Sequence, residues 1–153
     1  MNNFDIEVQY AVTHKLLPAE TDIKQWVTMT IGDRMTHAEL TVRLVDESES
    51  TQLNESFRHK QGSTNVLSFP VACAEEIGVP LLGDIAICAQ VVEREATDQN
   101  KEIVAHYAHM VVHGVLHLLG YDHIESGQAE RMEKLETEIL GQLGYPDPYQ
   151  CYS

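Results

Sequence analysis

Residues 113–123 read HGVLHLLGYDH, and this stretch governs how the rest of the chain is interpreted. His113 and His117 are four residues apart, which places them one turn apart on the same face of a helix. Gly120 offers a residue that can end this helix in the left-handed conformation. Because the chain can turn back there, we expect His123 to reach the same point in space as the two helical imidazoles.

Three imidazoles fill three corners of a tetrahedron and leave the fourth corner for water or substrate. Catalytic zinc has this arrangement, whereas structural zinc sites are usually closed by four protein ligands. The spacing therefore predicts one zinc ion held by His113, His117 and His123, although ligand chemistry alone also admits nickel or iron. His106 and His109 lie on the same predicted helix, and we expect them to pack within it or to support the ligands from behind.

Zinc in such a site lowers the pKa of its bound water to about 7 and polarises a carbonyl or phosphoryl oxygen. The site thus predicts hydrolysis and leaves open which bond is broken. Metzincin peptidases share this histidine spacing but carry a glutamate general base directly after the first histidine. Gly114 occupies that position here and has no side chain to accept a proton. Asp122 is a candidate proton carrier, and its alternative role is to orient His123.

The composition is that of an ordinary globular protein. The chain has 153 residues, of which 43% are hydrophobic and 22% charged, so we expect one domain over residues 1–153. No apolar run approaches the roughly 20 residues of a membrane span, and no secretory signal is visible. Cys73, Cys88 and Cys151 form no CxxC pair, which predicts reduced thiols in a cytoplasmic protein.

The net charge of −14 is unevenly distributed along the chain. Residues 1–70 hold 10 acids and 6 bases, or −4, and residues 71–153 hold 14 acids and 4 bases, or −10. This excess argues against broad nucleic-acid binding, so a polyanionic substrate needs a local basic patch or a partner. We interpret the acids of the last segment as a solvated helix face, comprising Asp122, Glu125, Glu130, Glu133, Glu136 and Glu138.

Hydrophobic periodicity predicts an α+β domain whose sheet packs against the histidine helix. Residues 72–80 are expected to form a loop. The expected strands are residues 4–10, 38–45, 66–69 and 83–88, the third of them an edge or terminal segment closed by Pro70. The expected helices are residues 18–31, a helix capped by Asp46 or Ser48, residues 89–97, residues 102–119, and a last helix capped by Ser126 and ended by Gly144.

Three stretches together match one family pattern. Residues 113–123 fit HGxLHLxGYDH at every fixed position, residues 53–70 are similar to LNxx[YF]RxKxxPTDVLSFP, and residues 83–88 are similar to GDIxIC. In these stretches the chain resembles the YbeY-type rRNA maturation factors, and their order and the chain length fit as well. Ser63 replaces the usual proline and Asn65 the usual aspartate, which removes one carboxylate from that turn.

The resemblance implies a mixed four-stranded sheet around a central helix. It also implies a zinc-dependent endoribonuclease of single-stranded RNA, acting in 16S rRNA 3′-end maturation and ribosome quality control, with rRNA and the ribosome or its proteins as partners. Arg58 matches the family's functional arginine, which is thought to hold the RNA phosphate. A guanidinium suits that task because it pairs bidentately with phosphate. The alternative is that Arg58 pairs with a nearby acid.

Other polar residues near Arg58 have two readings each. Three of them could extend a basic patch, but we interpret them more simply as solvated surface: Arg43, His59 and Lys60. Three others lie beside the short strand and either donate hydrogen bonds to substrate or close the turn: Thr64, Asn65 and Ser68. We expect Asp84 to be a turn or cap residue. Two other functions stay open: a metallopeptidase-like hydrolase, and a non-catalytic zinc-containing assembly factor whose acidic surface docks basic ribosomal proteins.

Overall fold

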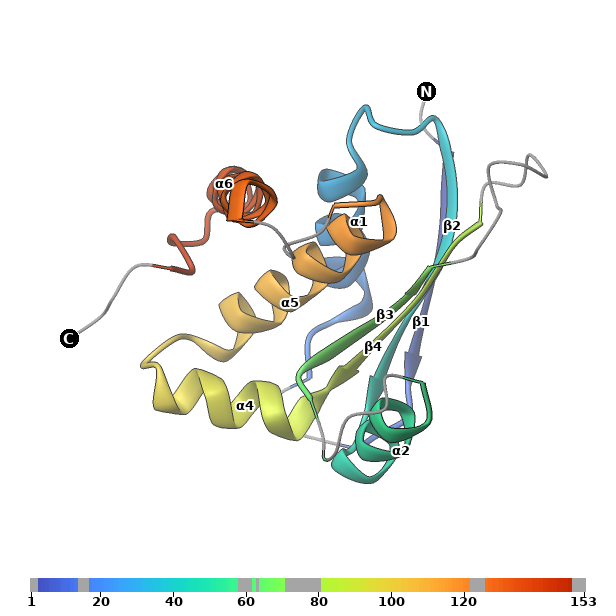
Figure 1. Ribbon diagram of the computed structural model, residues 1–153, viewed down its shortest axis with the longest axis vertical. Coiled ribbons are helices and arrows are strands. Elements are labelled where there is room, and N and C mark those ends of the chain that lie inside the picture. Colours follow the sequence, from blue (N-terminus) through green and yellow to red (C-terminus); the bar gives the residue numbers. More distant parts are fainter. Residues whose placement is uncertain are drawn as a thin grey trace.

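A mixed four-stranded sheet carries helices on both of its faces in the computed structural model (Figure 1). The structure describes residues 3–13, 17–57, 62, 64–70, 81–121 and 126–149. The strands are β1 (Asn3–Tyr10), β2 (His37–Val45), β3 (Val66–Pro70) and β4 (Leu81–Cys88). Their order in the sheet is β1-β2-β4-β3. β1, β2 and β4 run parallel, and β3 pairs antiparallel with β4 at the edge.

The helix that carries the histidines is enclosed by the rest of the fold. The helices are α1 (Glu20–Ile31), α2 (Glu47–Phe57), α4 (Ala89–Asp98), α5 (Ile103–Leu118) and α6 (Ser126–Gln142). α5 packs against α1, α4, α6, β3 and β4, and eleven of its 16 residues are buried. α1 and α5 cover one face of the sheet and α2 covers the other (Figure 1). The predicted central helix and α+β architecture are confirmed.

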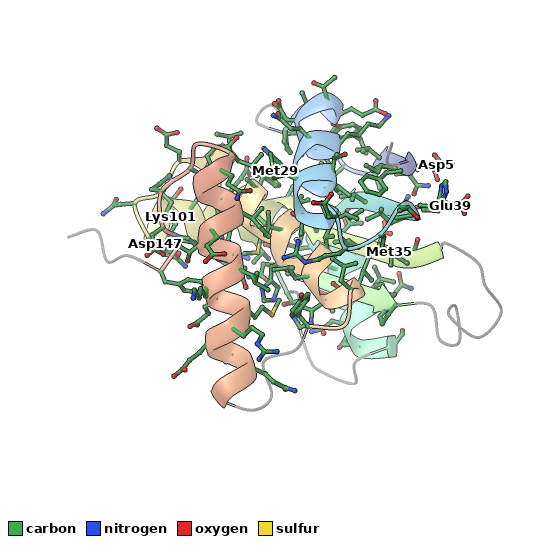
Figure 2. All side chains as sticks on the ribbon, turned by 90° about the horizontal axis from the view of Figure 1, so that it is seen from above. Asp5, Met29, Met35, Glu39, Lys101 and Asp147 are labelled. Carbon is green, nitrogen blue, oxygen red and sulfur yellow. The ribbon has the colours of Figure 1, made fainter. Side chains whose placement is uncertain are left out.

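Alternation along the strands produces the two faces of the sheet. In β2 the buried side chains of Ala38, Leu40, Val42 and Leu44 all enter the large core under α1 and α5. The opposite face carries a smaller cluster of Val45, Leu67, Ala86, Cys88 and Val91, against which Leu53 of α2 packs. Towards one end of β1 and β2, the register partners Asp5 and Glu39 on this face are exposed among the described residues and point outward (Figure 2). This alternation is the expected pattern of an amphipathic sheet.

Local sequence signals explain some of the element boundaries and close contacts. The Asp46 carboxylate accepts a hydrogen bond from the Glu49 backbone N–H at 2.8 Å, so Asp46 rather than Ser48 caps α2. α1 begins at Glu20, two residues after the predicted start, with Ala19 as its N-cap. Gly83 has a φ of +139°, and a Cβ there would lie 2.2 Å from the Phe69 carbonyl oxygen, so only glycine lets β3 approach β4.

Some expectations fall outside the part of the chain that the structure describes. These include the loop at 72–80 and the thiols of Cys73 and Cys151, whereas Cys88 is a buried free thiol as predicted. Asp84 lies inside β4 as its fourth residue and is exposed, so the expectation of a turn or cap residue is wrong. Among the described helices, none combines the length and hydropathy that a membrane span requires.

Candidate metal centre

The structure brings two of the three predicted ligands together on α5. The Nε2 atoms of His113 and His117 lie 3.1 Å apart, and the two ring centroids are separated by 4.6 Å. The helix then ends as predicted: Gly120 has a φ of +103°, and the Tyr121 N–H donates to the Leu116 carbonyl at 3.0 Å. The third predicted ligand, His123, lies outside the described residues.

A carboxylate from α6 fixes the orientation of His113. Glu136 Oε1 accepts a hydrogen bond from His113 Nδ1 at 3.0 Å, and the other oxygen accepts from His109 Nε2. The Tyr149 hydroxyl donates to Oε2 as a third partner at 2.7 Å. With a proton held on Nδ1 by this bond, the other ring nitrogen of His113, Nε2, faces His117. A carboxylate behind a ligating histidine commonly sets the tautomer in this way.

The electrostatics of this cluster favour an ionised carboxylate beside neutral imidazole. Burial would raise the pKa of Glu136, but hydrogen bonds from His109 and His113 outweigh it and lower the pKa to about 2. Burial lowers the pKa of His109 despite its bond to Glu136. Burial and the Glu136 charge both raise the pKa of Tyr149, so its hydroxyl keeps the proton that it donates. At neutral pH the Glu136 carboxylate is therefore ionised, and the Tyr149 hydroxyl beside it is uncharged.

The expectation that Glu136 belongs to a solvated acidic face is wrong. Its side chain is 1% exposed, because the position falls on the inner face of α6. A sequence signal was available: Met132 precedes Glu136 by four residues and Leu140 follows it by four, so all three share one helical stripe. A charged residue inside an apolar stripe is rarely buried without partners, and its presence there indicates a polar network.

Two further histidine expectations agree with the structure. His109 supports His113 through Glu136, as just described. His106 is 3% exposed and its Nε2 lies 2.9 Å from Glu95 Oε1, which also accepts from Asn65 Nδ2 at 3.1 Å. Burial would raise the pKa of Glu95, but hydrogen bonds from His106 and Asn65 dominate and lower it. His106 thus anchors α5 to α4 and to the turn before β3.

Gly114 is required by packing between α5 and the sheet. A Cβ at this position would lie 3.0 Å from Cγ2 and 3.1 Å from Cδ1 of Ile85 on β4. The Gly114 carbonyl also accepts a hydrogen bond from Ser68 Oγ on β3 at 3.2 Å. A side chain at 114 would therefore start towards β4, which leaves no room for a glutamate base like that of the metzincin peptidases.

Proximity of ligand atoms also marks a second combination that could hold a metal ion. It consists of His109, His113 and Glu136, whose candidate atoms all lie within 4.8 Å of one another. The same atoms are already joined by hydrogen bonds within this cluster. The cluster therefore has two uses open to it, direct ligation or support of a metal on the opposite side of His113.

The remaining predicted residues are either engaged elsewhere or outside the described part of the chain. Arg43, expected as solvated surface, is instead paired: it donates to both carboxylate oxygens of Glu49, at 2.7 and 3.1 Å, and to Gln9. The turn before β3 is held by Ser50 of α2, whose hydroxyl bonds the backbone carbonyl and N–H of Thr64, and by the Asn65 side chain, which accepts from the Val66 N–H. The predicted residues without described positions are Arg58, His59, Lys60, Asp122 and His123.

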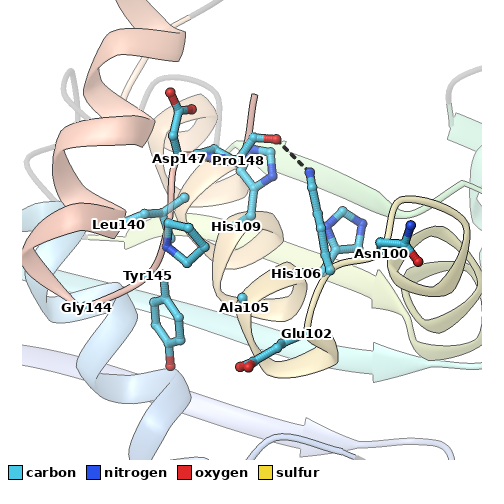
Figure 3. Close-up of a pocket in the computed structure, with 12 residues that line it drawn as sticks. Asn100, Glu102, Ala105, His106, His109, Leu140, Gly144, Tyr145, Asp147 and Pro148 are labelled. Atoms are coloured by element: carbon cyan, nitrogen blue, oxygen red, sulfur yellow. Dashed lines mark hydrogen bonds between the residues drawn. The ribbon is translucent and has the colours of Figure 1, made fainter. Parts of the chain in front are cut away.

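A pocket of about 440 Å³ opens beside the start of α5 (Figure 3). His106 and His109 line it, together with the end of α6 and residues 144–148, but His113 and His117 do not. The pocket is thus adjacent to the rear of the histidine cluster and separate from the Nε2 pair. The Nε2 pair is where the two described members of the predicted ligand set converge.

Comparisons with known proteins agree with this architecture. A family model described as "Endoribonuclease YbeY" matches residues 3–144. Among solved structures, the chain is similar to the solution structure of TM1509 from Thermotoga maritima, at 26% sequence identity and a TM-score of 0.60. That match covers 94% of this chain and 99% of the other.

Proposed function

Because the chain belongs to the YbeY endoribonuclease family, and is therefore a hydrolytic endoribonuclease of rRNA processing, we propose that it uses one zinc ion to cleave single-stranded RNA. We assign the ion to His113, His117 and His123. The biological substrate would be 16S rRNA, at its 3′-end maturation and during late ribosome quality control in the cytoplasm. The observation that carries the proposal is the convergence of two imidazole Nε2 atoms from one helix face.

The described residues fit zinc. At a zinc–nitrogen distance of about 2.05 Å, two ligands of a tetrahedral site stand roughly 3.3 Å apart. The Nε2 atoms of His113 and His117 are separated by 3.1 Å, so a small adjustment would allow both to ligate. Glu136 adds the hydrogen bond to Nδ1 that such a ligand usually makes.

We favour this pair over the cluster of His109, His113 and Glu136 as the metal's position. Both oxygens of Glu136 already accept hydrogen bonds, and His109 is 7% exposed, so ligation there would break buried hydrogen bonds. Ligation at the Nε2 pair would replace, among the described contacts, only the 3.1 Å contact between those two nitrogens and would leave the hydrogen bonds to Glu136 intact. Substituting His117 and Glu136 separately distinguishes the two positions, since only the Nε2 pair needs His117 as a ligand.

The protein residues have separate tasks in the proposed reaction. When bound, zinc supplies a nucleophile at neutral pH and positive charge for a phosphoryl oxygen. His113 and His117 fix the position of that charge, and Glu136 keeps the proton of His113 on Nδ1. Arg58 would bind the scissile phosphate through its planar fork and stabilise the additional negative charge of the transition state. Asp122 is the candidate proton carrier.

The acidity of the chain bears on how RNA would reach the site. With a net charge of −14, the surface as a whole repels a polyanion. Arg58 would supply local attraction, and basic ribosomal proteins would dock against the acidic surface. This favours cleavage on a ribosomal particle over free scanning of RNA.

The test measures zinc content and cleavage of single- and double-stranded rRNA fragments in two variants. His117→Ala is expected to lose both zinc and cleavage, and Arg58→Glu to keep zinc and lose cleavage. His37→Ala and Arg131→Glu are matched controls, because both residues are exposed and neither is assigned to the metal or the phosphate. Normal cleavage by Arg58→Glu would disprove the phosphate-binding role.

Two other outcomes would favour the alternative functions. Zinc-loaded wild-type protein that hydrolyses no single-stranded rRNA fragment would favour a non-catalytic assembly factor. Casein cleavage that disappears in His117→Ala would favour a peptidase. The packing at Gly114 argues against the peptidase before any assay is made.

A further inference from the structure

The residues after α6 fold back over the rear of the histidine cluster. We call residues 145–149 the C-terminal strap. The Tyr145 N–H donates to the Leu140 carbonyl at 2.8 Å, and the Tyr145 ring meets Trp26 edge-on, with centroids 6.1 Å apart. Lys101 Nζ donates to the Pro148 carbonyl at 2.6 Å, shown dashed in Figure 3. Lys101 and Asp147 lie on the same side of α6 in Figure 2. The strap is therefore anchored at both of its ends.

The strap ends in a side chain that reaches the Glu136 carboxylate. The Tyr149 hydroxyl donates to Glu136 Oε2 at 2.7 Å, and its ring meets His109 edge-on, with centroids 5.4 Å apart. The Tyr149 N–H is itself held by Asp147 Oδ1 at 2.9 Å. Tyr149 is 45% exposed, so its ring contributes less to the core than a buried aromatic would. Its hydroxyl is the part of the residue with a specific partner.

We infer that Tyr149 is a positioning residue of the metal centre: its hydroxyl holds Glu136 in the rotamer that keeps His113 Nε2 directed at the metal. Glu136 Oε2 accepts from Tyr149 and His109, and this leaves Oε1 facing His113 Nδ1. Without the hydroxyl, Oε2 loses one of two donors, and the carboxylate is freer to rotate. Docking of the strap therefore raises the affinity of the site for the metal.

This inference rests on the proposed function and extends it to residues beyond the family match, which ends at residue 144. A purely structural strap would behave differently. It would lower the unfolding temperature of the zinc-free and zinc-loaded protein alike and would leave the zinc-induced increment unchanged. A positioning role reduces that increment, because the increment depends on the dissociation constant for zinc.

The experiment compares Tyr149→Phe with Tyr145→Phe in the full-length protein. Both variants remove one hydroxyl from the strap, but only Tyr149 bonds Glu136. Zinc dissociation constants are measured by competition with a chromophoric chelator, together with unfolding temperatures with and without zinc. We expect Tyr149→Phe to weaken zinc binding by about 3- to 10-fold, below the roughly 10- to 100-fold typical of direct supporting partners. Tyr145→Phe should match the wild type.

A second variant guards against a folding defect in Tyr149→Phe. Lys101→Met detaches the strap at Pro148 without touching the Glu136 network, and it should weaken zinc binding in the same direction but less. Unchanged zinc affinity in Tyr149→Phe, or equal losses in both tyrosine variants, would overturn the inference. Failure of the wild type to bind zinc, or normal zinc binding by His117→Ala, would instead refute the proposed function.

Discussion

Replacing Glu136 by glutamine tests the central physical claim about the site, that a buried ionised carboxylate holds the histidines. The substitution keeps the size of the side chain and removes its charge. In place of two accepting oxygens, glutamine offers one oxygen and one NH2 group. Since His109, His113 and Tyr149 all donate to Glu136, at least one donor would then face another donor. We expect the native state to lose stability.

The size of the loss follows from the pKa of Glu136. That pKa falls from an ordinary 4.5 to about 2, and each unit corresponds to 1.36 kcal/mol, so the network favours the ionised form by about 3 kcal/mol. No discount for solvent screening is needed, because the side chain is 1% exposed. Removing one partner of a buried charged network typically costs a similar 3–5 kcal/mol. We therefore expect Glu136→Gln to cost about 3 kcal/mol at pH 7.

The pH dependence of the stability difference is a second, independent test of the ionised carboxylate. Because the folded-state pKa is depressed, this stabilisation is complete above the unfolded-state value near 4.5 and is lost as the pH falls through about 2. The difference between wild type and Glu136→Gln should thus stay level from pH 7 to pH 5. It should shrink steadily below pH 4.

The assay is urea unfolding followed by fluorescence, with a chelator present so that metal binding does not contribute. Trp26 is the chain's single tryptophan and is 1% exposed, so its emission reports loss of the core. Glu133→Gln is the matched control on the exposed face of α6, and we expect it to stay within about 0.5 kcal/mol of the wild type. A Glu136→Gln cost below about 1 kcal/mol at pH 7, or one that persists undiminished at pH 2, would refute the reasoning.

Three further predictions concern the scaffold, each measured by the same unfolding assay. Gly83→Ala should cost more than about 3 kcal/mol, because its Cβ would collide with the Phe69 carbonyl and its φ is positive; a milder loss would mean that β3 can separate from β4 cheaply. Gly114→Ala should destabilise the native state by about 1 kcal/mol, because overpacking against Ile85 outweighs the gain in helix propensity. In an Ile85→Ala background the same substitution should become neutral or stabilising, and equal effects in both backgrounds would disprove the contact. Asp46→Ala should cost about 1 kcal/mol by removing the cap of α2, and no loss would show that water replaces the cap.

The sequence predicts the elements better than their arrangement. Periodicity locates α5 and α6 within a few residues, and Pro70 correctly marks β3 as an edge strand. The order β1-β2-β4-β3 depends on pairing between distant segments, and no local pattern specifies it. The start of α1 at Glu20 could not be read from the sequence, because Ala19 occupies the N-cap position and makes no side-chain cap hydrogen bond.

In the site, too, features that depend on local spacing are predicted, and features that depend on contacts between distant segments are not. The pair His113 and His117 follows from helical spacing alone, and so does the end of the helix at Gly120. The charge of Glu136 predicts an exposed side chain, whereas its position in an apolar stripe of α6 indicates a buried one. Its partners lie 23 and 27 residues away in sequence, so the network that justifies burial becomes visible only when α6 packs on α5.

That separation has a consequence for the order in which the site is completed during translation. Chains are made from the N-terminus, so His113 and His117 leave the ribosome before the residue that sets the tautomer of His113. A nascent chain that stops short of Glu136 carries both imidazoles but no carboxylate behind them. At the proposed metal site, His113 would thus be held for ligation only after the last helix is synthesised and docked, and a chain terminated before Glu136 would lack the carboxylate that holds it.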